Sequence, residues 1–331
     1  MIKISTIITR GKNIESIHNV KCLIINQKKE IILTTKNDND LIFPRSSIKI
    51  FQAIPFIKSK ASSKFKLSPK QIALSCSSHC GELFHIKELE KWIKKINIPI
   101  DNLLCGIHNP INKKYSEKLL LKGKKPNQLH NNCSGKHLAM ISSCLSNNFS
   151  INNYLDFFHP HQINIRKTLE LFSENKILKN NFGIDGCSAP QYALSYTSLS
   201  IALLNLINSY YSKFDNADEV KLLISNILKF PEMIGGTNRF DSYLIKVSDK
   251  RIFCKGGAEG VILFAHLTKK IVGIIKIEDG NERAIPSALS KIFKHLKITD
   301  AKENEKLSNW CVSSIFNHAK KETGRIYTVI N

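Results

Sequence analysis

A helix start and a pair of reactive side chains coincide in one stretch of the sequence, Phe43-Pro44-Arg45-Ser46-Ser47-Ile48-Lys49-Ile50-Phe51. Pro44 disfavours helical backbone at the residue before it, and a serine such as Ser46 suits the start of a helix. Ser46 and Lys49 are three residues apart, so on a helix they would share one face, one turn apart. A hydroxyl beside a neutral amine is a nucleophile and base pair. The stretch therefore predicts a helix that begins near Ser46 and carries a Ser–Lys pair.

Length and composition describe a globular chain that can bury a substantial core. The sequence has 331 residues, of which 42% are hydrophobic and 23% are charged, as is typical of folded domains. No stretch of about 18 uninterrupted apolar residues occurs, so we expect no membrane span. The opening residues lack a basic start, a long apolar centre and a cleavage site, and the nine cysteines form no regular framework. Together these features predict a reduced, cytoplasmic protein.

The net charge of +22 raises the question of a nucleic-acid partner. Of the 49 basic residues seven are arginine and the remaining 42 are lysine, spread along the whole chain. Nucleic-acid-binding proteins tend to concentrate arginine and aromatic residues on one face. We therefore expect no nucleic-acid partner. A basic nucleic-acid-binding or zinc-carrying protein without turnover stays the alternative outside the enzymes.

Predicted strands lie near both ends of the chain, and predicted helices lie between them. The strands are apolar runs bounded by turn-forming residues: Val20–Ile25, Glu30–Thr35, Tyr243–Val247, Arg251–Cys254, Val261–His266 and Ile271–Ile277. The helices are Phe84–Ile96, Leu138–Leu145, Ile163–Phe172, Gln191–Tyr211, Ala217–Leu228 and Arg283–Leu296. The charged run Ala301–Lys306 is interpreted as a link to a C-terminal tail. This order implies one antiparallel sheet that the N- and C-terminal strands share.

Four stretches gather the small and polar residues used in catalysis: Pro44–Lys49, Ser77–Glu82, Asn131–His137 with Ile184–Pro190, and Cys254–Gly260. In this combination and order the chain resembles the rhizobial-type, or class 3, L-asparaginase family, from about Arg10-Gly11 to the helix Arg283–Leu296. The resemblance implies an α/β (α+β) fold of the serine β-lactamase-like type, hydrolysis of L-asparagine to L-aspartate and ammonia, and a homodimer. It also implies one domain over residues 1–331, with a sheet lobe at about 1–60 and 235–331 and a helical lobe at about 61–234.

Carried over from the family, the two Ser–Lys pairs fall on Ser46 with Lys49 and on Ser78 with Lys255. The S-x-x-K spacing of Ser46 and Lys49 also opens the active-site helix of β-lactamases, and Lys255-Gly-Gly stands where those enzymes have K-T-G, without the threonine. Our hypothesis is that Ser46 attacks the amide carbonyl and Lys49 takes its proton, while Ser78 and Lys255 relay protons. The reverse assignment, with Ser78 as the nucleophile, stays open.

The resemblance also implies a zinc ion held by Cys133, Lys136 and Cys187. Two thiolates and a water suit the softness and tetrahedral preference of zinc. A lysine ligand is unusual, because it must lose its proton, which the metal itself favours. Asp185 could be a partner of the metal ligands or a contact for the ammonium group of the substrate.

Two further residues are candidates for binding the substrate. Arg45 could bind a carboxylate, and His79 could orient a water or the ammonium group; the alternatives are a surface arginine and a buried, hydrogen-bonded histidine. Among enzymes, a glutaminase or a β-lactam or peptide hydrolase on a similar fold stays the rival. One methylene of substrate length separates asparagine from glutamine by only about 1–3 kcal/mol.

Overall fold

The computed structural model describes residues 2–36 and 38–331, and their contacts group them into two compact units. Unit 1 comprises Met1–Ser47, Leu194–Leu204 and Leu244–Asn331, and unit 2 comprises Ile48–Ala193 and Asn205–Tyr243. The sheet lobe was predicted to extend to about residue 60, but the residues from Ile48 onward belong to unit 2. The expectation of one domain over the whole chain stays a prediction, and each unit is described by itself.

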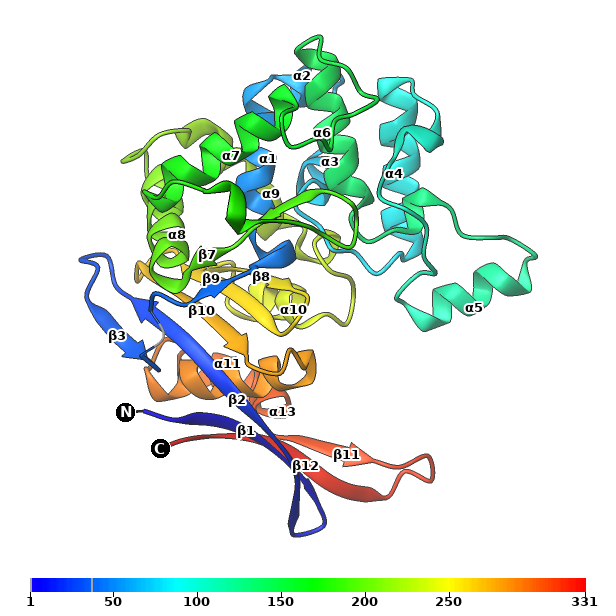
Figure 1. Ribbon diagram of the computed structural model, residues 1–331. Helices are drawn as coiled ribbons and strands as arrows, with labels where there is room; N and C mark the ends of the chain where they lie inside the picture. Colours follow the sequence, from blue (N-terminus) through cyan, green and yellow to red (C-terminus); the bar gives the residue numbers. More distant parts are fainter. Residues whose placement is uncertain (1, 37) are drawn as a thin grey trace. The chain divides into compact units, whose positions relative to one another are not determined.

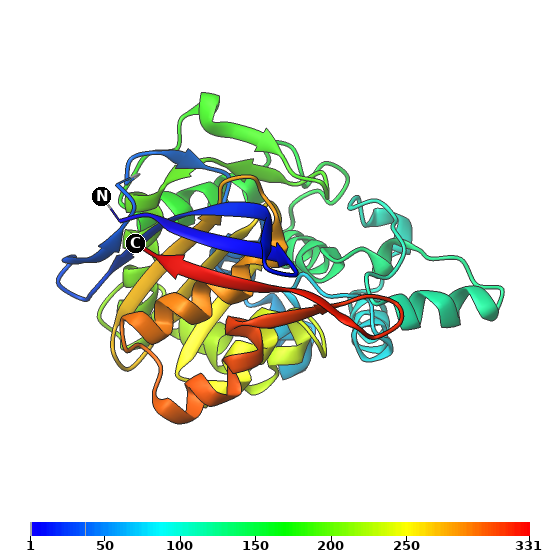
Figure 2. The ribbon, with the colours of Figure 1, turned by 90° about the horizontal axis from the view of Figure 1, so that it is seen from below.

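Unit 1 is built on an antiparallel sheet, in which eight strands of the described residues take part. The strands are β1 (Ile4–Arg10), β2 (Asn13–Ile25), β3 (Ile31–Thr34), β8 (Ile252–Gly257), β9 (Val261–His266), β10 (Ile271–Ile277), β11 (Ser313–Phe316) and β12 (Glu322–Ile330). Their order is β11-β12-β1-β2-β10-β9-β8, with β3 paired to β2. β1 (blue) and β12 (red) run side by side (Figures 1 and 2), with Ile4 opposite Ile330 and Ile8 opposite Ile326. The predicted sheet of N- and C-terminal strands is confirmed.

A helix covers one face of this sheet. α11 (Ile285–His295), preceded by a short 3₁₀ turn, packs against β1, β10 and β12. A buried row of hydroxyls joins helix and sheet: Thr328 Oγ1 lies 2.8 Å from Thr6 Oγ1 and 2.9 Å from Ser287 Oγ. Hydrogen bonding of this kind removes the cost of burying polar groups. The predicted helix Arg283–Leu296 is confirmed apart from its first turn.

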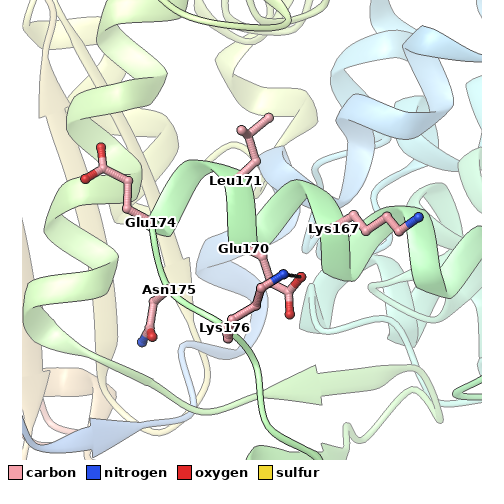
Figure 3. Close-up of a pocket in the computed structure, with 6 residues that line it drawn as sticks. All are labelled: Lys167, Glu170, Leu171, Glu174, Asn175 and Lys176. Carbon is pink, nitrogen blue, oxygen red and sulfur yellow. Dashed lines mark ion pairs between the residues drawn. The ribbon is translucent and has the colours of Figure 1, made fainter.

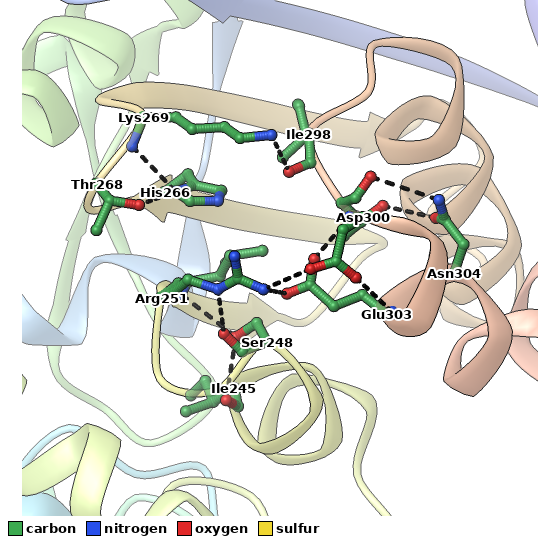
Figure 4. A network of polar contacts seen from close by, with 12 residues as sticks. Ile245, Ser248, Arg251, His266, Thr268, Lys269, Ile298, Asp300, Glu303 and Asn304 are labelled. Atoms are coloured by element: carbon green, nitrogen blue, oxygen red, sulfur yellow. Dashed lines mark hydrogen bonds and ion pairs between the residues drawn. The ribbon is translucent and has the colours of Figure 1, made fainter.

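The charged run Ala301–Lys306 is a helix, α12, and not a link. Asp300 and Glu303 form a reciprocal cap, in which each carboxylate accepts the backbone N–H of the other at 2.8 Å. Arg251 binds the same two carboxylates, at 2.9 Å from Asp300 Oδ2 and 2.8 Å from Glu303 Oε1 (Figure 4). The D-x-x-E spacing of Asp300 and Glu303 is a sequence signal for the start of a helix. The prediction of a link did not take this spacing into account. A short α13 (Ser308–Cys311) follows.

Two other predictions of secondary structure are wrong. The run Tyr243–Val247 belongs to helix α10 (Phe240–Val247), which shows how short apolar runs leave strand and helix ambiguous. Residues after Pro190 do not begin a long helix. They form β6 (Pro190–Tyr192), which pairs with β5 (Phe182–Ile184), and β7 (Leu194–Ser195), which pairs with β4 (Leu41–Ile42). Only then does α8 (Tyr196–Tyr210) start.

Unit 2 is mainly helical and is organised around α1 (Lys49–Lys58). Every residue of α1 up to Ile57 is buried, and the helix packs against α6, α7 and α9 (Figure 1). Aromatic pairs fix it there, with Phe51 edge-on to Phe172 at 5.4 Å between ring centroids. The other helices are α2 (Ala61–Lys64), α3 (Pro69–Leu74), α4 (Leu83–Ile96), α5 (Lys113–Leu121), α6 (Ser134–Ser146), α7 (Pro160–Ser173) and α9 (Ala217–Lys229). Among the described residues, no helix combines the length and apolar character that crossing a membrane requires.

We predict that His161 makes the protein less stable in mild acid. His161 is fully buried, its two ring nitrogens have no hydrogen-bond partner among the described residues, and burial first, then the charge of His159, lowers its pKa to about 3. Its pKa in the unfolded chain is about 6.5, so the unfolded state binds more protons as the pH falls below that value. The stability present above pH 6.5 is then lost, by about 2 kcal/mol at pH 5.

Urea unfolding at pH 7 and pH 5 measures this effect. The variant His161→Gln should lose about 2 kcal/mol less between the two pH values than the unmodified chain. The exposed His295 offers a matched control, because His295→Gln should keep the full pH dependence. An unchanged pH dependence in His161→Gln would contradict the assignment.

Candidate active site

Lys49, the first residue of α1, carries an amine into the interior of unit 2. Its side chain is completely buried, and Nζ donates hydrogen bonds to the Ser77 carbonyl, to Ser78 Oγ at 3.0 Å and to Cys133 Sγ at 3.1 Å. An amine without such partners would cost several kcal/mol in the interior. The structure therefore places Lys49 beside Ser78.

Ser46 lies before the helix and not at its first position. Arg45–Ile48 form a 3₁₀ turn, α1 begins at Lys49, and its N-cap is Ile48, which makes no side-chain cap. The neighbouring Ser47 hydroxyl donates to the Pro44 carbonyl of the same turn. The helix start is thus three residues later than predicted. The pairing of Ser46 with Lys49 stays a prediction.

The Ser78 segment is held by backbone hydrogen bonds. After α3 ends, the chain turns and then runs extended, so that the Ser78 N–H donates to the Ile234 carbonyl at 2.7 Å and the Cys80 N–H to the Gly235 carbonyl at 2.9 Å. The Ser78 side chain itself is half-buried. It therefore combines a fixed backbone with a hydroxyl that solvent still reaches.

A close approach of two helices brings Cys133 to this segment. Cys133 precedes α6, and its N–H is fixed by Asn131 Oδ1 at 2.8 Å. Gly135, in the first turn of α6, lies against the end of α3, where an added Cβ would overlap the Leu74 carbonyl and lie 3.1 Å from Ser77 Oγ. Only glycine permits this contact, which sets the position of the Cys133 turn relative to Ser77.

His79 is buried and structural in its contacts. Its Nδ1 accepts from the Gly81 N–H at 3.1 Å, and its Nε2 lies 2.9 Å from Ser134 Oγ. Burial, followed by the charges of His85 and Lys49, holds the pKa of His79 well below its usual range. With both ring nitrogens engaged, His79 holds the Ser78 segment against α6 in this structure.

Cys133, Lys136, Cys187 and Asp185 form one cluster in unit 2. Cys187 lies in the loop of the β5–β6 hairpin, 3.0 Å from Lys136 Nζ and 3.6 Å from Asp185 Oδ2. A hydrogen bond from the Cys133 thiol lowers the pKa of Cys187 to about 5; burial opposes this and the Lys136 charge supports it. The same hydrogen bond, with burial, raises the pKa of Cys133 to about 12.

Lys136 completes the charge balance of this cluster. Burial by itself lowers the pKa of Lys136, but the charges of Cys187, Cys133 and Asp185 outweigh it and raise the pKa. The arrangement without a metal is therefore a Cys187 thiolate paired with a Lys136 ammonium.

The donor set of this cluster fits zinc. Cys133, Asp185 and Cys187 each offer one ligand atom, and these three atoms lie within 4.8 Å of one another. This spacing allows all three to bind one ion at ligand-to-metal distances of about 2.0–2.3 Å. Two sulfurs and an amine or carboxylate match the softness of zinc. The residues predicted as ligands are thus brought together, and Asp185 stands beside them.

The other predicted residues, Arg45, Ser46 and Lys255, lie in unit 1. Lys255 lies on β8 and is 2% exposed, and its Nζ donates to the Gly256 carbonyl at 2.8 Å. The end of β8 touches the turn of Ser46, because a Cβ on Gly257 would stand 2.6 Å from the Pro44 carbonyl oxygen. Arg45 adopts a left-handed φ of 53°, as do many other non-glycine residues of the described chain. Its guanidinium lies 3.9 Å from Glu259.

Two features of this region escape sequence reasoning. One is the close approach at Gly135, which depends on packing between helices. The other is a second group of metal-ligand type, Cys80, Glu82 and His85, whose ligand atoms also lie within 4.8 Å of one another. Its only signal is the spacing C-x-E-x-x-H within a predicted catalytic stretch.

A surface pocket of unit 2 contains none of the predicted residues. It lies at the C-terminal end of α7, has a volume of about 430 Å³ and is lined by Lys167, Glu170, Leu171, Glu174, Asn175 and Lys176 (Figure 3). Three of its charged groups are already engaged: Glu170 pairs with Lys176 at 3.6 Å, and Glu174 accepts from Asn205 at 3.0 Å. We assign no function to it.

We predict that Gly135→Ala destabilises the protein although alanine favours helices. The added methyl group would overlap the Leu74 carbonyl, so the free energy of unfolding should fall by about 1–3 kcal/mol, as in other overpacked interiors. Urea unfolding measures it. Gly123→Ala is the comparison. A methyl group there meets no atom within 4 Å, so only the positive φ of residue 123 destabilises that variant. A smaller loss in Gly135→Ala than in Gly123→Ala would contradict the steric account.

Comparison with known proteins identifies a family. A sequence profile described as L-asparaginase II matches residues 6–328, and no protein with a curated description matches. Two solved structures are similar over most of their length. One, from Bacteroides dorei DSM 17855 and provisionally named a beta-lactamase, is 8% identical with a TM-score of 0.39 and covers 88% of this chain and 93% of its own.

The second solved structure is a class C beta-lactamase in complex with cefoxitin. It is 12% identical with a TM-score of 0.35 and covers 93% of each chain. Both proteins bear the name of the fold type that the sequence predicts, but TM-scores this low support no further argument. The family assignment depends on the profile match.

Proposed function

Because the chain belongs to the L-asparaginase II family of amidohydrolases, we propose that it hydrolyses L-asparagine to L-aspartate and ammonia by Ser–Lys chemistry. The observation that carries this proposal is the buried Lys49 amine, 3.0 Å from Ser78 Oγ. Hydrolysis of an amide needs a nucleophile, a group that takes its proton, and a donor of a proton to the departing ammonia. The pair contains all three functions.

Lys49 Nζ is the donor in all three of its contacts, with the Ser77 carbonyl, the Ser78 hydroxyl and the Cys133 sulfur. We propose that the amine gives up one proton before the reaction, because a neutral amine has two N–H donors and one lone pair. The Ser77 carbonyl and the Cys133 sulfur would then accept the two N–H groups, and the lone pair would face the Ser78 hydroxyl.

The reaction then runs in two halves. Ser78 Oγ attacks the amide carbon of asparagine as its proton moves to Lys49 Nζ, and Lys49 returns that proton to the nitrogen that leaves as ammonia. Water then attacks the aspartyl ester on Ser78, with Lys49 again as base, and aspartate leaves. The roles predicted for Ser46, Lys255 and Arg45, which lie in unit 1, stay predictions. The hypothesis from the sequence, in which Ser46 attacks and Lys49 takes its proton, stays a prediction, and the experiment below distinguishes the two.

We further propose zinc at Cys133, Lys136 and Cys187, with Asp185 beside them. When bound, the ion would supply positive charge that stabilises negative charge on the substrate. The Cys133 sulfur also accepts a hydrogen bond from Lys49 Nζ. The proposed zinc ligands are therefore in direct contact with the Ser78–Lys49 pair. Assembly as a homodimer likewise stays a proposal, which sedimentation of the purified protein would test.

Ammonia release from L-asparagine tests the function, with L-glutamine as the second substrate. We expect release from asparagine, and in Ser78→Ala and Lys49→Met a loss of kcat of about 10³-fold or more, because each removes a partner of the proton transfer. Ser63→Ala, which changes an exposed serine, is the matched control and should keep full activity.

The outcomes separate the two serines. Near-normal turnover in Ser78→Ala, with Ser46→Ala inactive, would overturn the assignment of Ser78 and support Ser46 as the nucleophile. No ammonia from either substrate, with zinc added to the unmodified chain, would overturn the asparaginase proposal itself.

Removal of the metal ligands tests the zinc proposal without reference to activity. Metal analysis should find one zinc per chain, and cobalt substitution should give a thiolate charge-transfer band. Both should be lost in Cys133→Ser and Cys187→Ser. Cys311→Ser is the matched control, because Cys311 is part of neither group of metal-ligand type. Zinc retained at full stoichiometry in both ligand variants would contradict the proposal.

A further inference from the structure

Glu82, a few residues beyond Ser78 in the chain, gathers donors from two distant segments. Its carboxylate accepts from the Thr237 N–H at 3.0 Å, from Thr237 Oγ1 at 2.7 Å and from Asn112 Nδ2 at 2.8 Å. We call Glu82, Asn112 and Thr237 the Glu82 network. Hydrogen bonds to an ionised group are stronger than those between neutral groups, so this network is a firm link between the segments.

The segment that carries Thr237 also supports the backbone of Ser78. The Ile234 carbonyl accepts from the Ser78 N–H, and the Gly235 carbonyl accepts from the Cys80 N–H. Residues 234–237 are therefore tied at one end to the Ser78 segment and at the other end to Glu82. Movement at either end would shift the other.

Gly236 makes this close arrangement possible. Its φ of 140° is unfavourable for a residue with a side chain, and an added Cβ would overlap Cys80 Sγ and lie 3.2 Å from Glu82 Oε2. A side chain at position 236 would therefore collide first with Cys80.

Asn112 extends the network to the start of α5. Its N–H donates to the Cys80 carbonyl at 2.8 Å, and its Oδ1 accepts from the Tyr115 N–H at 2.9 Å as the helix cap. Asn112 therefore offers its amide nitrogen to Glu82 and its amide oxygen to the helix, and it cannot exchange the two without losing the cap.

The same carboxylate belongs to the group Cys80, Glu82 and His85, but a metal site is not favoured there. His85 Nδ1 accepts from the Glu82 N–H at 3.2 Å, and Nε2 donates to the Glu232 carbonyl at 2.9 Å. Both ring nitrogens are engaged, and the carboxylate already binds three donors. The His85 ring and the Glu82 carboxylate are thus satisfied by hydrogen bonds within the protein.

We propose that Glu82 is a positioning residue for Ser78, acting through residues 234–237. By holding Thr237 and Asn112, it keeps the Ile234 carbonyl in place and thereby fixes the backbone from which the Ser78 hydroxyl projects. This inference rests on the proposed function, in which Ser78 reacts with the substrate.

An exchange of charge between Glu82 and Asn112 tests the proposal. In Glu82→Gln, an NH₂ group replaces one carboxylate oxygen, so at that position the side chain no longer accepts a hydrogen bond and two donors face each other. In the double variant Glu82→Gln with Asn112→Asp, that NH₂ group donates to the new carboxylate, which still caps α5. Net charge matches the unmodified chain. Glu90→Gln, an exposed position on the same helix, is the matched control.

Three readouts are compared: kcat and KM for L-asparagine, the melting temperature, and deuterium exchange of residues 234–240. In Glu82→Gln we expect kcat to fall about tenfold, with KM less affected, and exchange of residues 234–240 to quicken about tenfold. The double variant should recover both, and Glu90→Gln should change neither. Thr237→Val, which removes one donor at an exposed side chain, should give a smaller change of the same kind.

Activity and exchange in Glu82→Gln equal to those of Glu90→Gln would overturn the proposal, as would a double variant no better than the single one. If Glu82→Gln does not fold, Thr237→Val decides by the same readouts, and unchanged exchange and kcat there would overturn it. If the unmodified chain releases no ammonia, the proposed function has failed, and the exchange measurement alone then decides whether Glu82 holds residues 234–237.

Discussion

The burial of the Lys49 amine is the constraint on which the arrangement of unit 2 depends. α1 is enclosed along its length, so the amine at its first residue cannot reach solvent and must find acceptors inside. A carbonyl, a hydroxyl and a sulfur meet it, and they come from the Ser77–Ser78 turn and from Cys133. An unmatched amine would cost a large part of the stability of a typical domain. Folding of α1 into the interior and assembly of the candidate site are therefore one event.

The two candidate chemistries of unit 2 are neighbours because Cys133 has contacts in both directions. Its sulfur accepts from Lys49 and donates to Cys187, whose thiolate in turn faces Lys136. Gly135 sets the distance between the Cys133 turn and Ser77 by allowing backbone contact without a side chain. The site is thus assembled from short turns, each weakly stabilised by itself, that are kept in position by their contacts with one another.

Much of this could be predicted from the sequence, and the failures have physical reasons. Local pattern located the strands β9 and β10 and the helix α4, whereas Cys133, Lys136 and Cys187 were predicted only from the resemblance to a family. Local pattern could not tell that Lys49 would bond to Ser78, because that depends on how α1 packs. Pro190 was expected to begin a helix, yet pairing of β6 with β5 prevailed, since strand pairing between segments can override local propensity. The close packing of Gly135 and the bonds of Glu82 to Asn112 and Thr237 join residues distant in the chain, so no local signal predicts them.

The pairing of β1 with β12 has a consequence for synthesis. Ile4 lies opposite Ile330, so β1 cannot pair with β12 until residues 322–330 have been synthesised. Synthesis of the residues between them takes roughly 15–60 s at bacterial and eukaryotic rates. Throughout that time β1 has only the β2 hairpin as support, and its other edge offers free N–H and C=O groups to any passing strand. We expect a nascent chain of this design to need protection, from a chaperone or from its abundant lysines, whose charge repels other copies before the sheet closes.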